Sequence, residues 1–476
     1  MSVTLANAPS PRARLSIFYS LLIGFVAAVS SRQALALPSF ARQTGQPCSA
    51  CHTDFPGLTP FGRRFKLGGY TLGGGDYRSE LFPGDPSEKK KPYIPPAAFM
   101  AILGYTHTKS DLPAPTTPYA GNDNFVFSPF SIFYGGAITD HIGAFAQITH
   151  NAVPPGGFSD PFGHTWTWDN TDIRYANTGQ LGKTPFTYGV TANNNPSVQD
   201  VWNTTPAWIF PYDASTLAPT PATHTIVDGA FAAHVGGVGA YAFINDTYYL
   251  EATAYRTLGF NAQNDLGVDP LSSPGLYDGV APYWRLAAEP HWGSNWLEIG
   301  TFGMYAAIRP WTGSLASTFE GASKFTDLGV DSQYQYQGKN YWLTLRGSLI
   351  HEDQDRSANF LDGISTNSVD RLNTLRLQSS LSYGNNQKIV FTGQYFNTWG
   401  TSDALLYSGL SSGDSPNSNG WIAEIAYIPF NQGISSFLKW SNARISLQYT
   451  HYNEFDGTTM DASNNDTVFL SAWVAE

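Results

Sequence analysis

The sequence predicts an all-β fold: a closed antiparallel barrel of about 16 strands, preceded by a short and partly helical segment that plugs it. Three observations support this prediction. Only 13% of the 476 residues are charged, while 26 Tyr, 30 Phe and 13 Trp supply the aromatic side chains that strands favour. From residue 97 onward, segments of roughly ten residues alternate between polar and apolar positions. The connections between these segments alternate between short and long.

The start of the chain is expected to be a targeting segment that takes no part in the fold. A basic beginning precedes an apolar run over residues 15–30, and Ala34-Leu35-Ala36 supplies a small-x-small cleavage site. We therefore expect export through a cleaved signal peptide, residues 1–36, and a mature chain that begins at Leu37. The alternative is an uncleaved anchor, but the run is shorter than the ~20 residues that a helical span needs.

The mature chain is expected to be strongly acidic. The whole sequence holds 26 basic and 37 acidic residues, and the signal peptide contains three of the arginines and no acid. Cleavage thus leaves 23 basic against 37 acidic residues, a net charge of −14. Because such a protein repels phosphate backbones, no nucleic-acid partner is expected.

Both cysteines of the chain lie in one motif, Cys48-Ser49-Ala50-Cys51-His52. This spacing is used for covalent c-type haem attachment, because two thiols three positions apart can each add to a haem vinyl group. The adjacent imidazole can then take an axial position on the iron. We predict one covalently bound haem c, held by Cys48 and Cys51, with His52 as the proximal iron ligand.

The cysteine pair has three other interpretations. A redox dithiol would need a βαβ context, and a zinc site would need a second Cys/His pair nearby; the sequence offers neither. The third alternative is a small structural disulfide.

A short helix is predicted directly after the haem motif. Thr59 can cap its start, a proline follows at the first helical position, and Gly68-Gly69 ends it. Three of its side chains are candidate haem contacts: Phe61 and Phe65 for the porphyrin, and Arg63 for a propionate. A solvated basic face is the alternative for its cationic side chains.

The distal haem ligand is left open between two candidates. Cytochromes commonly take a Met or a His from elsewhere in the chain, and Met raises the reduction potential. In the first predicted strand, alternation turns Met100 inward, while His107 lies at the strand end, where the alternation rule relaxes. We rank Met100 and His107 together, ahead of Met304, which also faces inward in this register.

The remainder of the chain is predicted to form sixteen strands. Residues 374–383 illustrate the pattern, because Leu375, Leu377 and Leu381 fall on one face and polar side chains on the other. The predicted strands cover residues 97–108, 125–136, 141–151, 164–175, 185–192, 230–242, 246–256, 280–290, 296–308, 324–336, 340–351, 374–383, 387–397, 419–428, 442–452 and 466–474.

The connections between these strands predict where the barrel lies. Those after even-numbered strands are mostly tight, and those after odd-numbered strands are mostly long, as in residues 193–228, 351–370 and 400–418. Short periplasmic turns and long external loops are typical of bacterial outer-membrane barrels, so we predict that location, with outer-membrane lipid around the barrel. A soluble sandwich, which also alternates, is the alternative. The pattern fits poorly after the fourth and the fourteenth strands.

Charged side chains fall on the inward-facing row of this register. In lipid, Arg or Lys near the midplane would cost ~2–4 kcal/mol each. The inward row carries Arg285, Arg346, Arg376, Arg444, Glu251, Glu298 and Glu424. The lumen of about sixteen strands is wide enough for a folded insert.

The segment before the barrel is the insert that we expect there. Residues 37–96 hold too few apolar side chains for an independent core, so they need a staple or a host. We therefore divide the chain into a signal peptide (1–36), a monohaem cytochrome c plug (37–96) and a porin-like transmembrane β-barrel (97–476).

Four stretches carry a resemblance to a known family: Leu37-Pro38-Ser39-Phe40-Ala41-Arg42-Gln43-Thr44-Gly45, residues 48–52, residues 58–70 and residues 105–109. They resemble the fused outer-membrane monohaem cytochrome and porin of iron-oxidising bacteria. The resemblance is specific over about residues 37–109 and concerns architecture and length beyond them. Cys48 and Cys51 match the family's thioether positions, and His52 matches its proximal ligand. The final residue, Glu476, departs from the aromatic end that is common in such barrels.

Membership of that family implies an electron-transfer cytochrome that oxidises extracellular Fe(II). Electrons would pass through the barrel-embedded haem to periplasmic carriers, such as a blue-copper protein or a soluble c-type cytochrome. Two alternatives stay open: a conduit for a different extracellular donor, and a diffusion porin with a structural haem plug.

Overall fold

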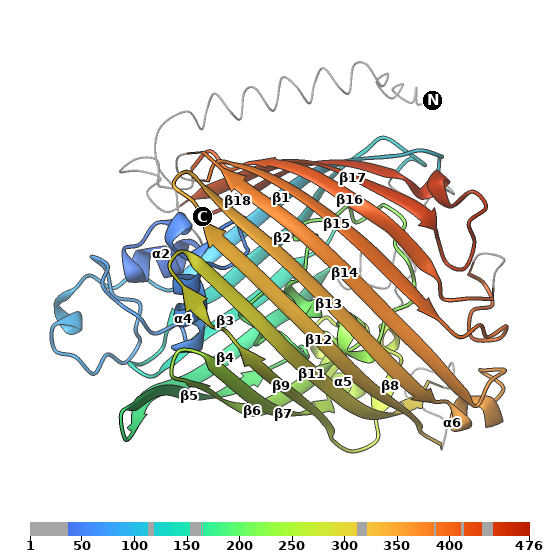
Figure 1. Ribbon diagram of the computed structural model, residues 1–476, viewed down its shortest axis with the longest axis horizontal. Helices are drawn as coiled ribbons and strands as arrows, with labels where there is room; N and C mark the ends of the chain where they lie inside the picture. The colour runs from blue at the N-terminus through green and yellow to red at the C-terminus, as the bar shows by residue number, and fades with distance from the viewer. Residues whose placement is uncertain are drawn as a thin grey trace, which may run out of the picture.

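The chain forms one closed antiparallel β-barrel (Figure 1). A computed structural model describes residues 37–112, 119–152, 163, 165–311, 321–384, 387–410, 414–430 and 441–476, so the predicted signal peptide lies outside the described residues. Neighbouring crossings of the wall pair in chain order, and β1 (Ala97–Thr108) pairs with β18 (Thr467–Ala475) from Met100↔Ala475 to Thr108↔Thr467, which closes the sheet.

The other strands are β2 (Asn124–Ala137), β3 (Ile142–His150), β4 (Trp166–Leu181), β5 (Thr184–Asn193), β6 (Val235–Ile244), β7 (Tyr248–Thr257), β8 (Gly275–Tyr277), β9 (Ala281–Ala288), β10 (His291–Trp292), β11 (Asn295–Pro310), β12 (Ser323–Gln337), β13 (Tyr341–Asp355), β14 (Val369–Tyr383), β15 (Ile389–Gly400), β16 (Ser418–Tyr427) and β17 (Asn442–Glu454).

The barrel has sixteen crossing strands, as predicted. The sheet contains 18 strands, but β8, β9 and β10 all pair with β11 and are consecutive pieces of one crossing. Counting these three pieces as one gives sixteen. An even number of antiparallel strands brings both ends of the barrel chain to the same rim.

The strands form because side chains alternate between the two faces of the wall. In β12, buried and exposed positions alternate along most of its 15 residues. Large apolar side chains on the outer positions are exposed, as expected for a surface that meets lipid. Examples are Phe99, Ile132, Val190, Leu250, Ile299, Leu328, Leu345, Leu377, Phe391 and Ile425.

The charged row predicted for the lumen is confirmed. Six of its seven side chains are buried inside the wall, and the seventh, Arg376, pairs inward with Asp228. Arg444 pairs with Glu424 on the neighbouring strand. Alternation therefore predicted correctly which face carries charge in the seven strands that hold these residues.

The turn after the fourth strand fits the short-turn pattern better than predicted. β4 extends to Leu181, and only Gly182 and Lys183 separate it from β5, with Gly182 in the left-handed region (φ 64°). The predicted strand ended at residue 175 because the last residues of β4 are mostly polar and do not alternate clearly. In the long connection after the fourteenth strand, residues 431–440 lie outside the described residues.

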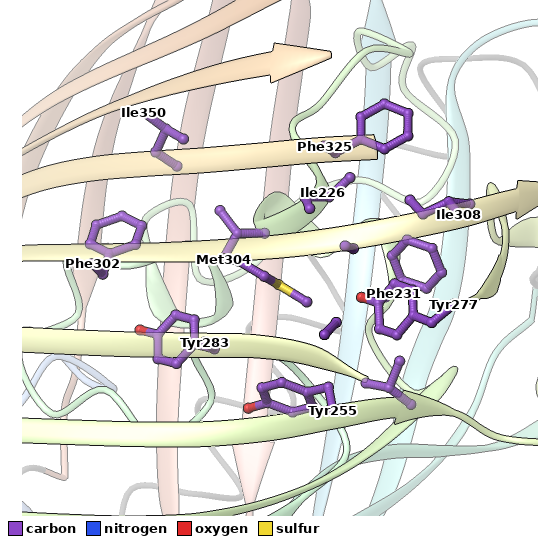
Figure 2. Packing of buried hydrophobic residues seen from close by; sticks show 14 residues of the cluster. Ile226, Phe231, Tyr255, Tyr277, Tyr283, Phe302, Met304, Ile308, Phe325 and Ile350 are labelled. Carbon is purple, nitrogen blue, oxygen red and sulfur yellow. The ribbon is translucent and has the colours of Figure 1, made fainter. Parts of the chain in front are cut away.

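One connection differs from the prediction in kind. Residues 194–234, expected largely as an external loop, fold back into the lumen, where Val198, Trp202 and Phe210 are fully buried. Ile226 and Phe231 from the end of this inserted segment pack against the inner wall in an apolar cluster (Figure 2). The segment folds inward because its apolar side chains are removed from water in the lumen, whereas in an external loop they would remain exposed.

The helices before β1 lie at the rim that also holds the C-terminus (Figure 1). They are α2 (Pro38–Thr44), α3 (Cys48–Cys51) and α4 (Pro60–Leu67), followed by a single turn, η1 (Glu88–Lys90); α5 (Phe260–Asp265) and α6 (Ser357–Leu361) belong to connections of the barrel. No helix in the described part of the chain has the length and apolar run to cross a membrane.

Candidate functional site

The haem motif lies on a single helical turn that is tied to the helix after it. α3 contains both cysteines, and the backbone N–H of His52 donates to the carbonyl of Cys48 at 2.8 Å. Thr59 caps α4, as predicted, because its Oγ1 accepts from the N–H of Gly62 at 3.1 Å. The same Thr59 donates its N–H to the carbonyl of Cys51 at 2.8 Å.

Gly62 permits this close approach of α3 and α4. A Cβ atom at Gly62 would lie 2.3 Å from the carbonyl oxygen of Cys51, which is a backbone atom and cannot move aside alone. The predicted helix after the motif is therefore confirmed, and its packing on α3 depends on a glycine.

The ring of His52 is held in one orientation. Its Nδ1 lies 2.9 Å from the carbonyl oxygen of Pro56, which can only accept, so Nδ1 carries the proton and Nε2 has a lone pair. Burial lowers the pKa of His52 to about 4. A neutral imidazole whose second nitrogen is hydrogen-bonded to a carbonyl is the form in which histidine ligates metals.

An internal cavity of about 470 Å³ lies next to this ring. Its lining comes from three parts of the chain: the helical plug, strands of the wall and the inserted segment 194–234. His52 and Cys51 lie on one side of it. Most of its lining is apolar, and includes Phe40, Phe65, Met100, Phe133, Phe145 and Trp208.

These residues fit a covalently held haem in size and chemistry. The volume lies within the range of cofactor pockets, ~300–1,000 Å³, and the apolar lining suits a porphyrin. Cys51 and the imidazole of His52 already border the cavity. The Cys48 sulfur is instead turned toward Asn442, whose Nδ2 lies 3.2 Å away, so a bond from Cys48 to a haem requires that side chain to rotate.

In the structure the two cysteines are free thiols, Cys48 buried and Cys51 partly buried. Cys48 and Cys51 are not joined by a disulfide. Burial raises the pKa of Cys51 to about 12 and that of Cys48 well above its usual value, whereas redox-active C-x-x-C thiols have lowered pKa values. Over the described ranges, no three His, Cys, Asp or Glu side chains gather into a metal site.

Of the candidate distal ligands, the structure brings only Met100 to the cavity. Met100 faces inward from β1, as the register predicted. His107 lies at the other end of β1, is about half exposed, and its Nδ1 bonds the carboxylate of Asp123 at 2.8 Å. Met304 packs in the separate apolar cluster of Figure 2.

Of the three candidate haem contacts on α4, only Phe65 lines the cavity. Phe61 is 38% exposed and lies outside the lining. Arg63 is directed toward the wall of the barrel, where its Nε lies 2.7 Å from Oε2 of Glu289 and both side chains are fully buried. Phe61 and Arg63 thus do not meet the place that a haem would occupy.

The basic side chains of α4 anchor the plug. Besides the Arg63–Glu289 pair, Arg63 donates to Oε1 of Gln335. Lys66 donates from Nζ to the carbonyls of Val198 and Asp200 at 2.7 and 2.8 Å, so it joins the plug to the inserted segment. Burial lowers the pKa of Lys66 to about 7. The alternative of a solvated basic face therefore does not hold for Arg63 and Lys66.

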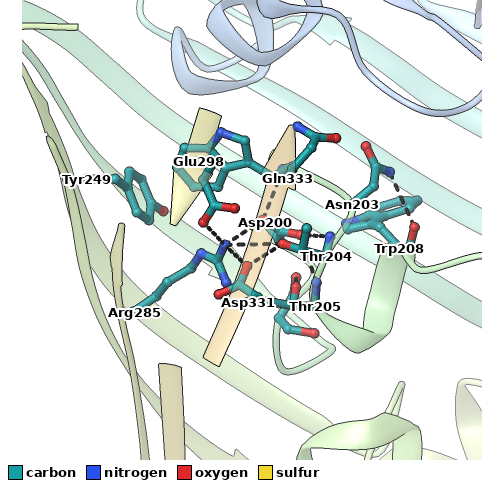
Figure 3. A network of polar contacts seen from close by, with 12 residues as sticks. Asp200, Asn203, Thr204, Thr205, Trp208, Tyr249, Arg285, Glu298, Asp331 and Gln333 are labelled. Carbon is teal, nitrogen blue, oxygen red and sulfur yellow. Dashed lines mark hydrogen bonds and ion pairs between the residues drawn. The ribbon is translucent and has the colours of Figure 1, made fainter. Parts of the chain in front are cut away.

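The inserted segment is fixed to the wall by a buried polar network (Figure 3). Nη2 of Arg285 lies 2.6 Å from Oδ2 of Asp331, 3.1 Å from Oε1 of Glu298 and 3.6 Å from Oδ1 of Asp200. Asp200 belongs to the inserted segment and accepts from the N–H groups of Trp202 and Thr204, each at 3.0 Å. One arginine thus holds acids from two strands and from the segment together.

The cavity residues of the inserted segment were missed by sequence reasoning. Trp208, Tyr212 and Asp213 all line the cavity, and the segment containing them was taken for an external loop. A signal was present: Trp202, Trp208 and Phe210 within nine residues are unusual for a solvated loop.

The site thus combines a plugged sixteen-stranded barrel with a c-type haem motif beside an apolar cavity. No protein-family model matches the chain, and no curated protein matches it. Among solved structures it is similar to OmpT, an outer-membrane protein of Vibrio cholerae (8% identity, 80% of this chain and 95% of that chain, TM-score 0.40). It is also similar to OmpF of Salmonella typhi (12% identity, 80% and 97%, TM-score 0.41) and to the outer-membrane channel DcaP of Acinetobacter baumannii (12% identity, 80% and 96%, TM-score 0.42).

Proposed function

We propose that this protein is an outer-membrane c-type cytochrome that accepts electrons from extracellular Fe(II) and passes them to periplasmic carriers. The observation that carries the proposal is the apolar cavity, which is bordered by Cys51, by a neutral and oriented His52 and by the Met100 side chain.

The residues of the chain have distinct roles in this proposal. Cys48 and Cys51 hold one haem c through thioether bonds, and His52 supplies the proximal ligand. Met100 is the candidate distal ligand that the geometry favours, and Phe65 packs beside the porphyrin. The haem, when bound, supplies reversible one-electron chemistry.

The wall and the anchored plug explain why such a site belongs inside a barrel. A hydrocarbon layer of ~30 Å separates an extracellular donor from periplasmic acceptors, so a redox site that serves both must lie within the membrane wall. Two buried anchors, Arg63 and Lys66, keep the plug in a fixed position, as a conduit needs. Periplasmic acceptors of suitable chemistry are a blue-copper protein or a soluble c-type cytochrome, and outer-membrane lipid surrounds the wall.

A diffusion porin with a structural haem plug is the second candidate. The sixteen-stranded closed barrel with a polar inner wall favours it, since water-filled lumens are built in this way. The buried anchors of the plug argue against a gate that swings out of the lumen. A conduit for a donor other than Fe(II) is compatible with the same site.

The test is rapid-mixing absorbance of the purified, oxidised, detergent-solubilised protein with Fe(II) across a range of pH. We expect fast appearance of a reduced c-type spectrum, which is lost on Cys48→Ala, Cys51→Ala or His52→Ala. A haem spectrum that stays oxidised with Fe(II) but is reduced by other donors would refute the iron assignment. A large steady conductance of the same protein in planar bilayers, with no redox response, would favour the porin.

A further inference from the structure

We infer that Asp213 is a redox-linked proton acceptor, which binds one proton when one electron enters the cavity site. The inference rests on the proposed haem site and adds a means of regulation to it. In the balanced step, one Fe(II) outside the protein is oxidised to Fe(III), the site gains that electron, and a proton from water forms an O–H bond with the Asp213 carboxylate.

The position of Asp213 supports this role. It lies on the inserted segment, lines the same cavity as His52 and is only 6% exposed. Its Oδ2 has no hydrogen-bond partner among the atoms that the structure describes. Its backbone carbonyl accepts from Nε2 of Gln448 at 3.1 Å, which ties this part of the segment to β17.

The other carboxylates of the cavity are already engaged. Three acids line it, and Oδ2 of Asp169 accepts from Thr149 at 2.8 Å. Asp200 accepts from backbone N–H groups and lies beside Arg285. Within the described part of the lining, Asp213 is therefore the carboxylate with an oxygen open to a proton.

The surroundings of Asp213 have opposing effects on its pKa. Burial raises its pKa to about 6, while a hydrogen bond with Ser471 of β18 and the guanidinium of Arg444 act in the opposite direction. Arg444 is itself paired with Glu424, whose carboxylate raises the pKa of Asp213 further. Lys66, also on the lining, is directed to backbone carbonyls of the inserted segment.

An added electron should therefore change the proton affinity of Asp213. It makes the site more negative by one charge, and in a buried apolar environment that charge acts strongly on a nearby carboxylate. The carboxylate then binds a proton more tightly, and by linkage a protonated Asp213 favours the reduced site. The midpoint potential should fall as pH rises through the transition, by no more than about 59 mV per pH unit for one electron.

The test is a spectroelectrochemical titration of the full-length, haem-loaded protein in detergent between about pH 4 and pH 8. This range is centred on the pKa of Asp213, which is about 6. We expect the wild-type potential to fall with pH, and Asp213→Asn to hold one pH-independent potential equal to the acidic limit of the wild type. Asp213→Glu should keep a pH dependence. Asp169→Asn, which alters another acid of the same cavity lining, should leave the pH dependence of the potential unchanged.

The outcomes separate this inference from the proposed function. Asp213→Asn with an intact haem spectrum and an unchanged pH dependence would overturn the inference and leave the cytochrome assignment standing. Loss of the dependence in Asp169→Asn instead would also overturn it. Absence of any c-type spectrum in the wild type would overturn the proposed function, and the inference with it.

Discussion

Replacing Arg63 with methionine should loosen the plug from the wall of the barrel. Arg63 and Glu289 form an ion pair at 2.7 Å in which both side chains are fully buried. Removal of one partner of a buried pair costs about 3–5 kcal/mol, because the remaining charge is left without compensation. Arg64 also approaches Glu289, at 3.4 Å, so the lower end of that range applies. Because an equilibrium constant changes tenfold for every ~1.4 kcal/mol, the equilibrium constant for undocking α4 should rise roughly a hundredfold.

Hydrogen exchange of the α4 amides, followed by mass spectrometry in detergent, measures this change, because exchange reports local opening. Exchange in Arg63→Met should be faster by about the same factor. The double variant Arg63→Met/Glu289→Met should return toward the wild type, since no charge is left buried. Arg309→Met is the matched control, because its pair with Asp278 is about half exposed at both side chains. The reasoning would be refuted if the α4 amides of Arg63→Met exchanged at the wild-type rate. It would also be refuted if they exchanged no more slowly in the double variant than in Arg63→Met.

Three further predictions concern the site. Met100→Leu conserves volume and should lower the folding stability by less than about 1.5 kcal/mol, but it should lower the midpoint potential, because Met ligation raises that potential. The control Met304→Leu should leave the potential unchanged. Equal potentials in the wild type and both variants would exclude Met100 as the ligand. Gly62→Ala places a Cβ 2.3 Å from the Cys51 carbonyl and should reduce haem incorporation, measured as haem absorbance per protein, whereas Gly393→Ala meets open space and should not. His107→Ala should leave both the absorption spectrum and the potential unchanged, since His107 pairs with Asp123 outside the cavity; a changed spectrum would contradict this placement.

The barrel could be predicted because its signal is local. Alternation with period two is written into each strand, and a one-residue error would have turned Arg346 or Glu298 toward lipid. Strand ends were less certain: β14 begins at Val369, five residues before the predicted start, because polar residues beyond the apolar band weaken the contrast. The strand predicted over residues 280–290 covers β9, whereas β8 and β10, the other two pieces of this crossing, lie outside the predicted range.

The site could be predicted only as far as it is local in sequence. Cys48, Cys51 and His52 are contiguous, and the helix cap at Thr59 follows them closely. The pairing of Arg63 with Glu289 joins residues far apart in the chain, and nothing near Arg63 indicates a buried partner. The inserted segment has no periodicity to show that it folds inward, so its contribution to the cavity required the three-dimensional structure.

The seam between β1 and β18 also has a consequence for biogenesis. These are the first and last strands to leave the ribosome, so the wall stays open along one side until the nine residues of β18 dock. Afterwards Cys48 is fully enclosed, with Asn442 of β17 beside its sulfur. The wall strand β17 thus covers the Cys48 sulfur only once the barrel has folded. Under the proposed function, the Cys48 thiol would be most accessible for haem attachment before β17 and β18 dock.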